Sequence, residues 1–264
     1  MIVGGARVGR DGTLHLAFER TGAATAVVRC RYTLPLQVLA PLALDDPSAV
    51  VSVLNPTGGL VGGDRLDIDV EVGAAAHACL TTPSATKVYR AGGPPAVQAV
   101  RIAAGPGATV EWVPDHTIPF AGAAFRQTID VTLGEGARLI AVDAFSAGRV
   151  ARGETWRFAL LDSALAIRDA RGWLLRDRFV LDGGLAAGGV ACAEGHPYWA
   201  TVVVIADSGV EDFLAALDAP FGAEMGGAVL PRRGALVRCL ATDAPALIGA
   251  VESVWAAARR HVLG

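Results

Sequence analysis

Three segments of the chain repeat one pattern, in which alternating apolar residues lead into a short turn that begins with glycine and precedes a second alternating run. The first glycines of these turns are Gly73, Gly105 and Gly134, so the spacings are 105 − 73 = 32 and 134 − 105 = 29 residues. Alternation with a period of two gives a strand one apolar face. A unit of two short strands and a turn buries that face only by stacking on its neighbours. The repeat therefore predicts stacked β-coils.

Strand patterns extend through most of the chain, and helical spacing is confined to its end. Residues 64–72 alternate almost perfectly, whereas residues 212–217 group their apolar members on one helical face before Pro220. Asp243 is a favourable N-cap for a second helix of about five turns. The apolar stripe of that helix consists of Leu247, Val251, Val254, Trp255, Ala258 and Val262.

These patterns predict a mainly β fold of stacked β-coil or β-helix-like layers of short strands, with two helices near the C-terminus. No linker that is long or polar enough to separate domains interrupts the sequence. We therefore expect a single domain over residues 1–264, with a β body over residues 1–205 and a helix-containing C-terminal part over residues 206–264.

The composition excludes several classes of protein. The chain is 52% apolar and 19% charged with a net charge of −3, which excludes extended disorder and a basic field for nucleic acid or an anionic membrane. Its most apolar run, 198–206, is too short to span a bilayer. No apolar stretch follows the basic residues of 1–11, so we expect no secretory signal and a cytoplasmic protein. The isolated cysteines are then expected to be thiols. They are Cys30, Cys79, Cys192 and Cys239.

The sequence lacks the common motifs of catalytic and nucleotide-binding sites. There is no phosphate-binding loop, no nucleophile elbow and no paired-histidine metal motif. His77 and Cys79 would share one face of a strand, where they could hold a transition metal or simply belong to the core. Two ligands are fewer than a stable metal site needs. We therefore assign no catalytic residue, no cofactor-binding residue and no tightly bound metal, and we expect that the chain is not an enzyme.

Two groups of polar residues stand out in this apolar chain. Residues 81–90 contain several hydroxyls and the only lysine, Lys87. This segment is either a solvated turn or the polar lining of a passage or contact surface. Carboxylates at the ends of strand patterns form the second group, and they are either solvated or available for acid–base chemistry or transient binding of a hard cation. They are Asp64, Glu111, Asp115, Asp143 and Glu154.

Two long segments have specific sequences, NPTGGLVGGD at 55–64 and TTPSATKVYR at 81–90. Shorter ones follow at 111–114, 117–120 and 148–154, and Trp255 and Arg259 are four residues apart in the last helical pattern. Together these segments resemble the motifs of the UreD (UreH) family of urease accessory proteins, over nearly the whole chain and in the same order. His116 lies where that family usually has an amide or acidic residue, and we assign it no role.

The resemblance implies a scaffold that joins a UreF-type helical protein and a UreG-type GTPase to urease apoprotein and helps to deliver nickel. It also implies a mostly β, coil-like fold with two helices, and a water-filled passage as the nickel route. Scattered oxygen ligands bind nickel weakly, so the ion would be in transit and not stored. The positions that match this lining are Asp64, Thr82, Ser84, Lys87, Glu111, Asp143 and Glu154.

Two other functions remain open on the residues alone. A β-solenoid carbohydrate-active enzyme could use strand-end carboxylates, but it needs two carboxyls at a fixed separation and usually aromatic platforms. Aromatic residues are only 6% of the chain and are dispersed. A structural adaptor without any metal contact is the third possibility.

Overall fold

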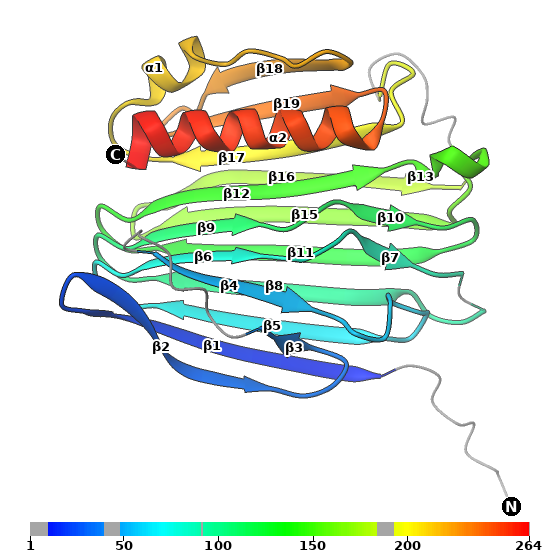
Figure 1. Cartoon of the computed structure of the whole chain (residues 1–264), viewed down its shortest axis with the longest axis horizontal. Helices are drawn as coiled ribbons and strands as arrows, with labels where there is room; N and C mark the ends of the chain where they lie inside the picture. The colour runs from blue at the N-terminus through cyan, green and yellow to red at the C-terminus, as the bar shows by residue number, and fades with distance from the viewer. Residues whose placement is uncertain (1–9, 40–47, 91, 184–192, 264) are drawn as a thin grey trace, which may run out of the picture.

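The computed structural model describes residues 10–39, 48–90, 92–183 and 193–263. Within these ranges the chain passes back and forth between two facing sheets (Figure 1). The first sheet has seven described strands, in the spatial order β16 (Gly172–Asp182), β15 (Leu160–Asp169), β11 (Ala124–Leu133), β8 (Ala96–Ala104), β5 (Arg65–Val72), β1 (Asp11–Thr21) and β2 (Ala24–Tyr32).

The second sheet lies opposite the first and has ten described strands. Its main path is β18 (Ala223–Val229), β19 (Ala235–Ala241), β17 (Tyr198–Ile205), β12 (Arg138–Ser146), β9 (Thr109–Val113), β6 (His77–Thr81), β4 (Ala49–Leu54) and β3 (Gln37–Val38). Two short strands lie off this path: β10 (Thr117–Pro119) pairs with β12, and β7 (Thr86–Val88) pairs with β10. A separate hairpin joins β13 (Gly148–Arg149) to β14 (Glu154–Thr155), with a 3₁₀ turn at Val150–Arg152 between them.

The predicted repeat is confirmed as three stacked coils. In each coil a strand of the first sheet crosses through the glycine turn to a strand of the second, as β5 to β6, β8 to β9 and β11 to β12. Corresponding strands are parallel in both sheets. The turns also bond to one another, since the Ala75 amide donates to the carbonyl of Pro106 (2.9 Å) and the Gly107 amide to that of Glu135 (2.8 Å).

Close stacking of the turns explains why each begins with glycine. A Cβ added to Gly134 would lie 2.7 Å from the backbone of Gly105 and Pro106, and one added to Gly105 would lie 2.9 Å from the amide nitrogen of Ala74. Real Cβ atoms do not approach backbone so closely, so a side chain at either glycine would push the coils apart.

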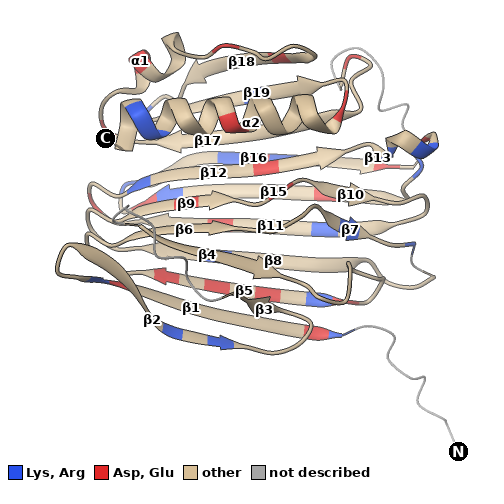
Figure 2. Ribbon diagram, in the orientation of Figure 1, with Lys and Arg blue, Asp and Glu red and all other residues tan. Residues whose placement is uncertain are grey.

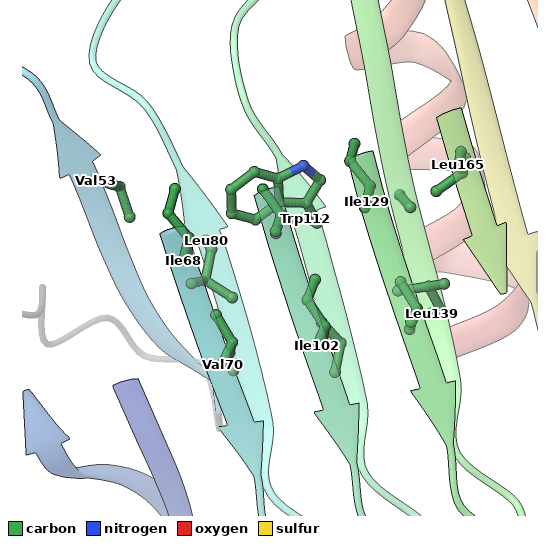
Figure 3. Close-up of a cluster of buried hydrophobic side chains, with 14 of the residues drawn as sticks. Val53, Ile68, Val70, Leu80, Ile102, Trp112, Ile129, Leu139 and Leu165 are labelled. Atoms are coloured by element: carbon green, nitrogen blue, oxygen red, sulfur yellow. The ribbon is translucent and has the colours of Figure 1, made fainter. Parts of the chain in front are cut away.

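The main core fills the space between the two sheets. Side chains such as Ile68, Ile102 and Ile129 from the first sheet meet Leu80, Trp112 and Leu139 from the second (Figure 3). The outer face of the first sheet is charged, and Figure 2 shows acidic segments along β5. There the guanidinium of Arg101 bonds to Asp69 (2.5 Å) and Asp67 (3.1 Å). Alternation along β5 thus separates a dry face from an ion-paired one.

A second core lies between the outer face of the second sheet and two described α-helices, α1 (Val210–Ala215) and α2 (Ala244–Ala258). Asp243 caps α2 as predicted, accepting a hydrogen bond from the Ala246 amide at 2.8 Å. A π-helical turn, Arg259–Leu263, continues α2, and Val262 is buried in it. The first helix begins and ends two residues earlier than the 212–217 pattern predicts, because Gly209 starts it in the left-handed conformation. No helix of the described residues is long and apolar enough to cross a membrane.

Candidate functional site

The two longest sequence motifs, 55–64 and 81–90, pack against each other at one end of the sandwich. The Leu60 amide donates to the Lys87 carbonyl and the Tyr89 amide to the Leu60 carbonyl, both at 2.8 Å. A Cβ on Gly59 would lie 2.5 Å from that same Lys87 oxygen, and Gly59 has a φ of +152°. Glycine at this position therefore allows the two segments to meet.

These segments form the mouth of a cavity of about 290 Å³ that extends between the sheets. Thr82, Ser84 and Lys87 line it, and Ser84 and Lys87 are exposed to solvent. Asp143 on β12 also lines the cavity, although its side chain is buried. The structure thus brings together four of the seven candidate lining residues that the sequence suggested.

The carboxylate of Asp143 is held by two donors from the first sheet. Gln127 Nε2 donates to one oxygen and Ser163 Oγ to the other, both at 2.7 Å. Gln127 in turn accepts a hydrogen bond from Gln98 Nε2 at 2.9 Å. Burial raises the pKa of Asp143 to about 6, although the two hydrogen bonds favour the charged form. Near neutral pH this group can therefore gain or lose a proton with little cost.

Trp112 is a further polar group at this cavity. Its indole lines the cavity and is buried, and its Nε1 has no hydrogen-bond partner among the described residues. A buried donor of this kind usually bonds to an ordered water when protein offers no acceptor. The cavity therefore has a place for water deep between the sheets.

A second cavity of about 210 Å³ lies beside α2, on the outer side of the second sheet. It shares four lining residues with the first cavity, namely Thr82, Pro114, Asp115 and Ala144. Trp255 and Ile248 of α2 form its opposite wall. The two hollows therefore border one another at these shared residues, and this junction lies between the 81–90 mouth and α2.

His116 and Asp115 form a pair at this junction. His116 Nδ1 and the Asp115 carboxylate are 2.7 Å apart, and the His116 amide donates to the same oxygen. Burial disfavours the charged form of Asp115, but these bonds outweigh it and hold the pKa of the carboxyl below its usual value. Thr82 Oγ1 accepts a hydrogen bond from the Asp115 amide (2.9 Å), which ties the pair to the mouth.

Glu111 lies on the opposite face of the second sheet from Asp143. Its neighbour Trp112 points into the main core, so Glu111 points outward to α2, where it is fully buried. It bonds to His77 Nε2 (2.6 Å) and Trp255 Nε1 (2.5 Å), and it pairs with Arg259 Nε (3.1 Å). The two carboxylates therefore cannot act on one substrate from one face, as a paired acid–base site would require.

Asp64 and Glu154 also lie apart from both cavities. Asp64 fastens its own loop, since its oxygens accept from the backbone amides of Arg10 (2.8 Å) and Val61 (2.9 Å). Glu154 pairs with Arg149 across the β13–β14 hairpin, and those hydrogen bonds hold the pKa of Glu154 below its usual value.

His77 and the cysteines form neither a metal site nor a disulfide among the described residues. His77 bonds to Glu111, and the described part of the chain contains no group of three or more His, Cys, Asp or Glu side chains arranged to hold a metal ion. Of the cysteines, Cys30, Cys79 and Cys239 are described and none of these three is in a disulfide, whereas Cys192 lies outside the described residues.

Comparison with known proteins decides the family. The profile described as "UreD urease accessory protein" matches residues 10–264. The chain belongs to the UreD family of urease accessory proteins. A protein named "Urease accessory protein UreD" from Alkalilimnicola ehrlichii is 37% identical over 262 residues, which cover 97% of this chain and 88% of the relative.

Other members of the UreD family are similarly close. The proteins from Pseudomonas fluorescens (36% identical, 95% of this chain, 90% of the relative) and Streptomyces griseus (35% identical, 96% and 90%) carry the names "Urease accessory protein UreD" and "Urease accessory protein UreD 2". Membership of the UreD family supports a role in urease maturation and implies a non-catalytic helper.

Several residues of the site were not predicted from the sequence. Gln98, Gln127 and Ser163 face the interior from three adjacent strands of the first sheet, at matched positions of the ladder. Gln127 was recognisable, because it occupies an inward position between Phe125 and Ile129 in a strand that alternates cleanly. A polar residue at such a position signals an internal network or cavity.

Proposed function

We propose that this UreD-family protein is a urease maturation scaffold that joins UreF-type and UreG-type accessory proteins to urease apoprotein and passes nickel toward its active site. The proposal places this work in the cytoplasm, where a GTPase partner has its nucleotide. Nickel is cargo here, and no cofactor is held.

The observation that carries the proposal is the pair of adjacent cavities, which share four lining residues. The larger one runs from the exposed 81–90 segment to Asp143, and the smaller one leads from the shared residues to the surface beside α2. A scaffold without a transport role has no need of an internal route lined with hydroxyls and a buried carboxylate, because polar groups in a core cost stability.

The chemistry of the lining suits a metal ion that must move on. Thr82, Ser84 and Asp143 offer neutral and anionic oxygens, which bind nickel less tightly than thiolate or imidazole sets. The pKa of Asp143, raised to about 6 by burial, allows it to change charge as a dication passes. Weak, spaced ligands favour transfer over retention.

Exposed apolar side chains support the scaffold part of the proposal. Phe221 is fully exposed in the loop before β18, Trp173 is half exposed on β16 and Ile248 projects from α2. Large apolar side chains at a surface favour contact with other proteins. We therefore expect the chain to be poorly soluble alone and to be solubilised by a UreF-type partner.

Co-expression tests the proposal. The chain is produced with and without the UreF-type, UreG-type and urease proteins of its own organism, followed by affinity capture and size exclusion. A stable complex with all three is the expected result. A well-behaved monomer that captures none of them would contradict it.

The carbohydrate-enzyme alternative cannot use Glu111 and Asp143 as its pair of carboxyls, since the two face opposite sides of one sheet. A scaffold without metal contact remains the second candidate. It predicts normal nickel loading of urease when the cavity is filled, a result tested in the Discussion.

A further inference from the structure

A layer of polar side chains crosses the otherwise apolar core at the level of Asp143. On the second sheet Asp143 of β12 pairs with Thr201 of β17, and Thr201 pairs with Arg238 of β19. All three lie on the inner face, since their neighbours two residues away pack in the main core. Gln98, Gln127 and Ser163 face this layer from the first sheet.

The layer continues to the edge of the sandwich, where the two sheets are joined by an ion pair. The guanidinium of Arg238 donates to Thr201 Oγ1 and, at 2.7 Å, to the carboxylate of Asp177 on β16. Strand β16 is at the edge of the first sheet, so this pair spans the gap between the sheets. Thr201 is buried, whereas about half of the Arg238 side chain is exposed.

Apolar contacts close the gap beside the ion pair. The rings of Phe179 and Trp199 approach edge-on at 6.1 Å between β16 and β17, and Leu175 and Leu236 pack against the core on the other side. At this edge of the described structure, the Arg238 side chain lies between the polar layer and solvent.

We propose that Arg238 plugs the polar layer at this edge, so that a dication in the interior cavity is prevented from leaving sideways between β16 and β19. The inference rests on the proposed nickel passage, and it names the residue that closes that passage on the side of β16. The plug acts in two ways. Its side chain fills the gap between Asp177 and Thr201. Its positive charge also repels a cation that reaches Thr201, although the ion pair with Asp177 offsets part of that repulsion.

A thiol placed behind the plug tests this directly. Thr201→Cys is introduced into the full chain fused to maltose-binding protein, and its modification by aminoethyl methanethiosulfonate, a small cationic reagent, is followed by peptide mass analysis. Thr201 is buried and lies between the cavity and Arg238, so the rate reports access through the edge.

With Arg238 in place the reaction should be slow, and Arg238→Ala should speed it by roughly tenfold or more. Arg238→Lys keeps a long cationic side chain and should stay near the slow rate. Asp177→Asn keeps the side-chain volumes but releases the guanidinium, and should give an intermediate rate. Arg178→Ala, which breaks the exposed Arg178–Asp162 pair on the outer face of β16, is the matched control and should change nothing.

Equal rates in the Arg238→Ala and Arg178→Ala backgrounds would overturn the plug, whatever the fate of the nickel passage. The nickel content of urease matured with Arg238→Ala then tests the link to transport. A lower content than with Arg178→Ala is expected, and an opened edge with normal loading would overturn the plug's role in transfer. The two proposals can fail separately. If only the nickel passage is wrong, Arg238→Ala still speeds labelling relative to Arg178→Ala, but a large side chain in the cavity does not change the nickel content of urease.

Discussion

The indole N–H of Trp255 on α2 donates to the carboxylate of Glu111 on β9 at 2.5 Å, across a separation of 144 residues in the sequence. The same carboxylate binds His77 at 2.6 Å and Arg259 at 3.1 Å. Glu111 therefore joins a strand of the second coil to the C-terminal end of the helix that forms the wall of the second cavity. Two of the shorter sequence segments noted above, at 111–114 and at Trp255 and Arg259, meet through this one side chain.

Replacing Glu111 with Ala should loosen α2. The change leaves Arg259, Trp255 and His77 without their buried acceptor, and losing one member of a buried ion pair costs about 3–5 kcal/mol. Hydrogen exchange of the full chain in complex with its partner should show faster exchange over 244–263. Glu111→Gln keeps an acceptor oxygen and should lose less protection from exchange than Glu111→Ala. Trp255→Phe removes only the indole donor and should also lose less. Unchanged exchange in Glu111→Ala would show that apolar packing alone holds the helix.

The charge of Asp143 should make stability depend on pH in a defined window. Its pKa is raised to about 6 in the folded state from an ordinary 3.8, so the folded protein keeps a proton that the unfolded chain has lost. The free energy of unfolding should then fall as pH rises from about 4 to 6, by about 3 kcal/mol from this group.

Asp143→Asn should lack this component, because it cannot ionise. Pulse proteolysis in urea at pH 4 to 8 measures the difference between the two proteins. The stability of the Asn variant relative to the natural protein should increase as pH rises from about 4 to 6 and become constant above that range. A difference that does not vary with pH would mean that Asp143 titrates normally.

Gly134→Ala should destabilise the stack of coils. Its Cβ would lie 2.7 Å from the backbone of Gly105 and Pro106, and overpacking of this kind costs about 1–3 kcal/mol. Gly226→Ala is the matched control, since a Cβ there meets nothing within 4 Å. Urea midpoints of the two variants should differ clearly. Equal midpoints would show that the turns can separate without cost.

The sequence predicts the fold well because the decisive signals are local. Each glycine turn and each alternating strand, such as β5, is specified by a few adjacent residues, and stacking follows from their repetition. The start of α1 is misplaced by two residues because a left-handed Gly209, and not a side-chain cap, starts that helix.

The site is harder to predict because its strands are buried on both faces. All five residues of β9 are buried, so the pattern does not tell which face carries Glu111 and which carries Trp112. The same holds for most of β12 and hence for Asp143. In β11, by contrast, exposed and buried residues alternate, and Gln127 could have been assigned to the interior. Pairing between distant residues such as Asp143 and Ser163 follows only from the assembled sheets.

If nickel passes from the first cavity to the second, a large side chain at their shared lining should block its transfer. Thr82→Trp places a large ring at a residue that lines both cavities, and Thr128→Trp places the same ring on the exposed outer face of β11 as a control. Affinity capture of the partner proteins and the nickel content of purified urease are measured on the same cultures. Both variants should assemble normally, and only Thr82→Trp should leave urease poor in nickel. Normal nickel content with Thr82→Trp in an intact complex would contradict this passage of nickel.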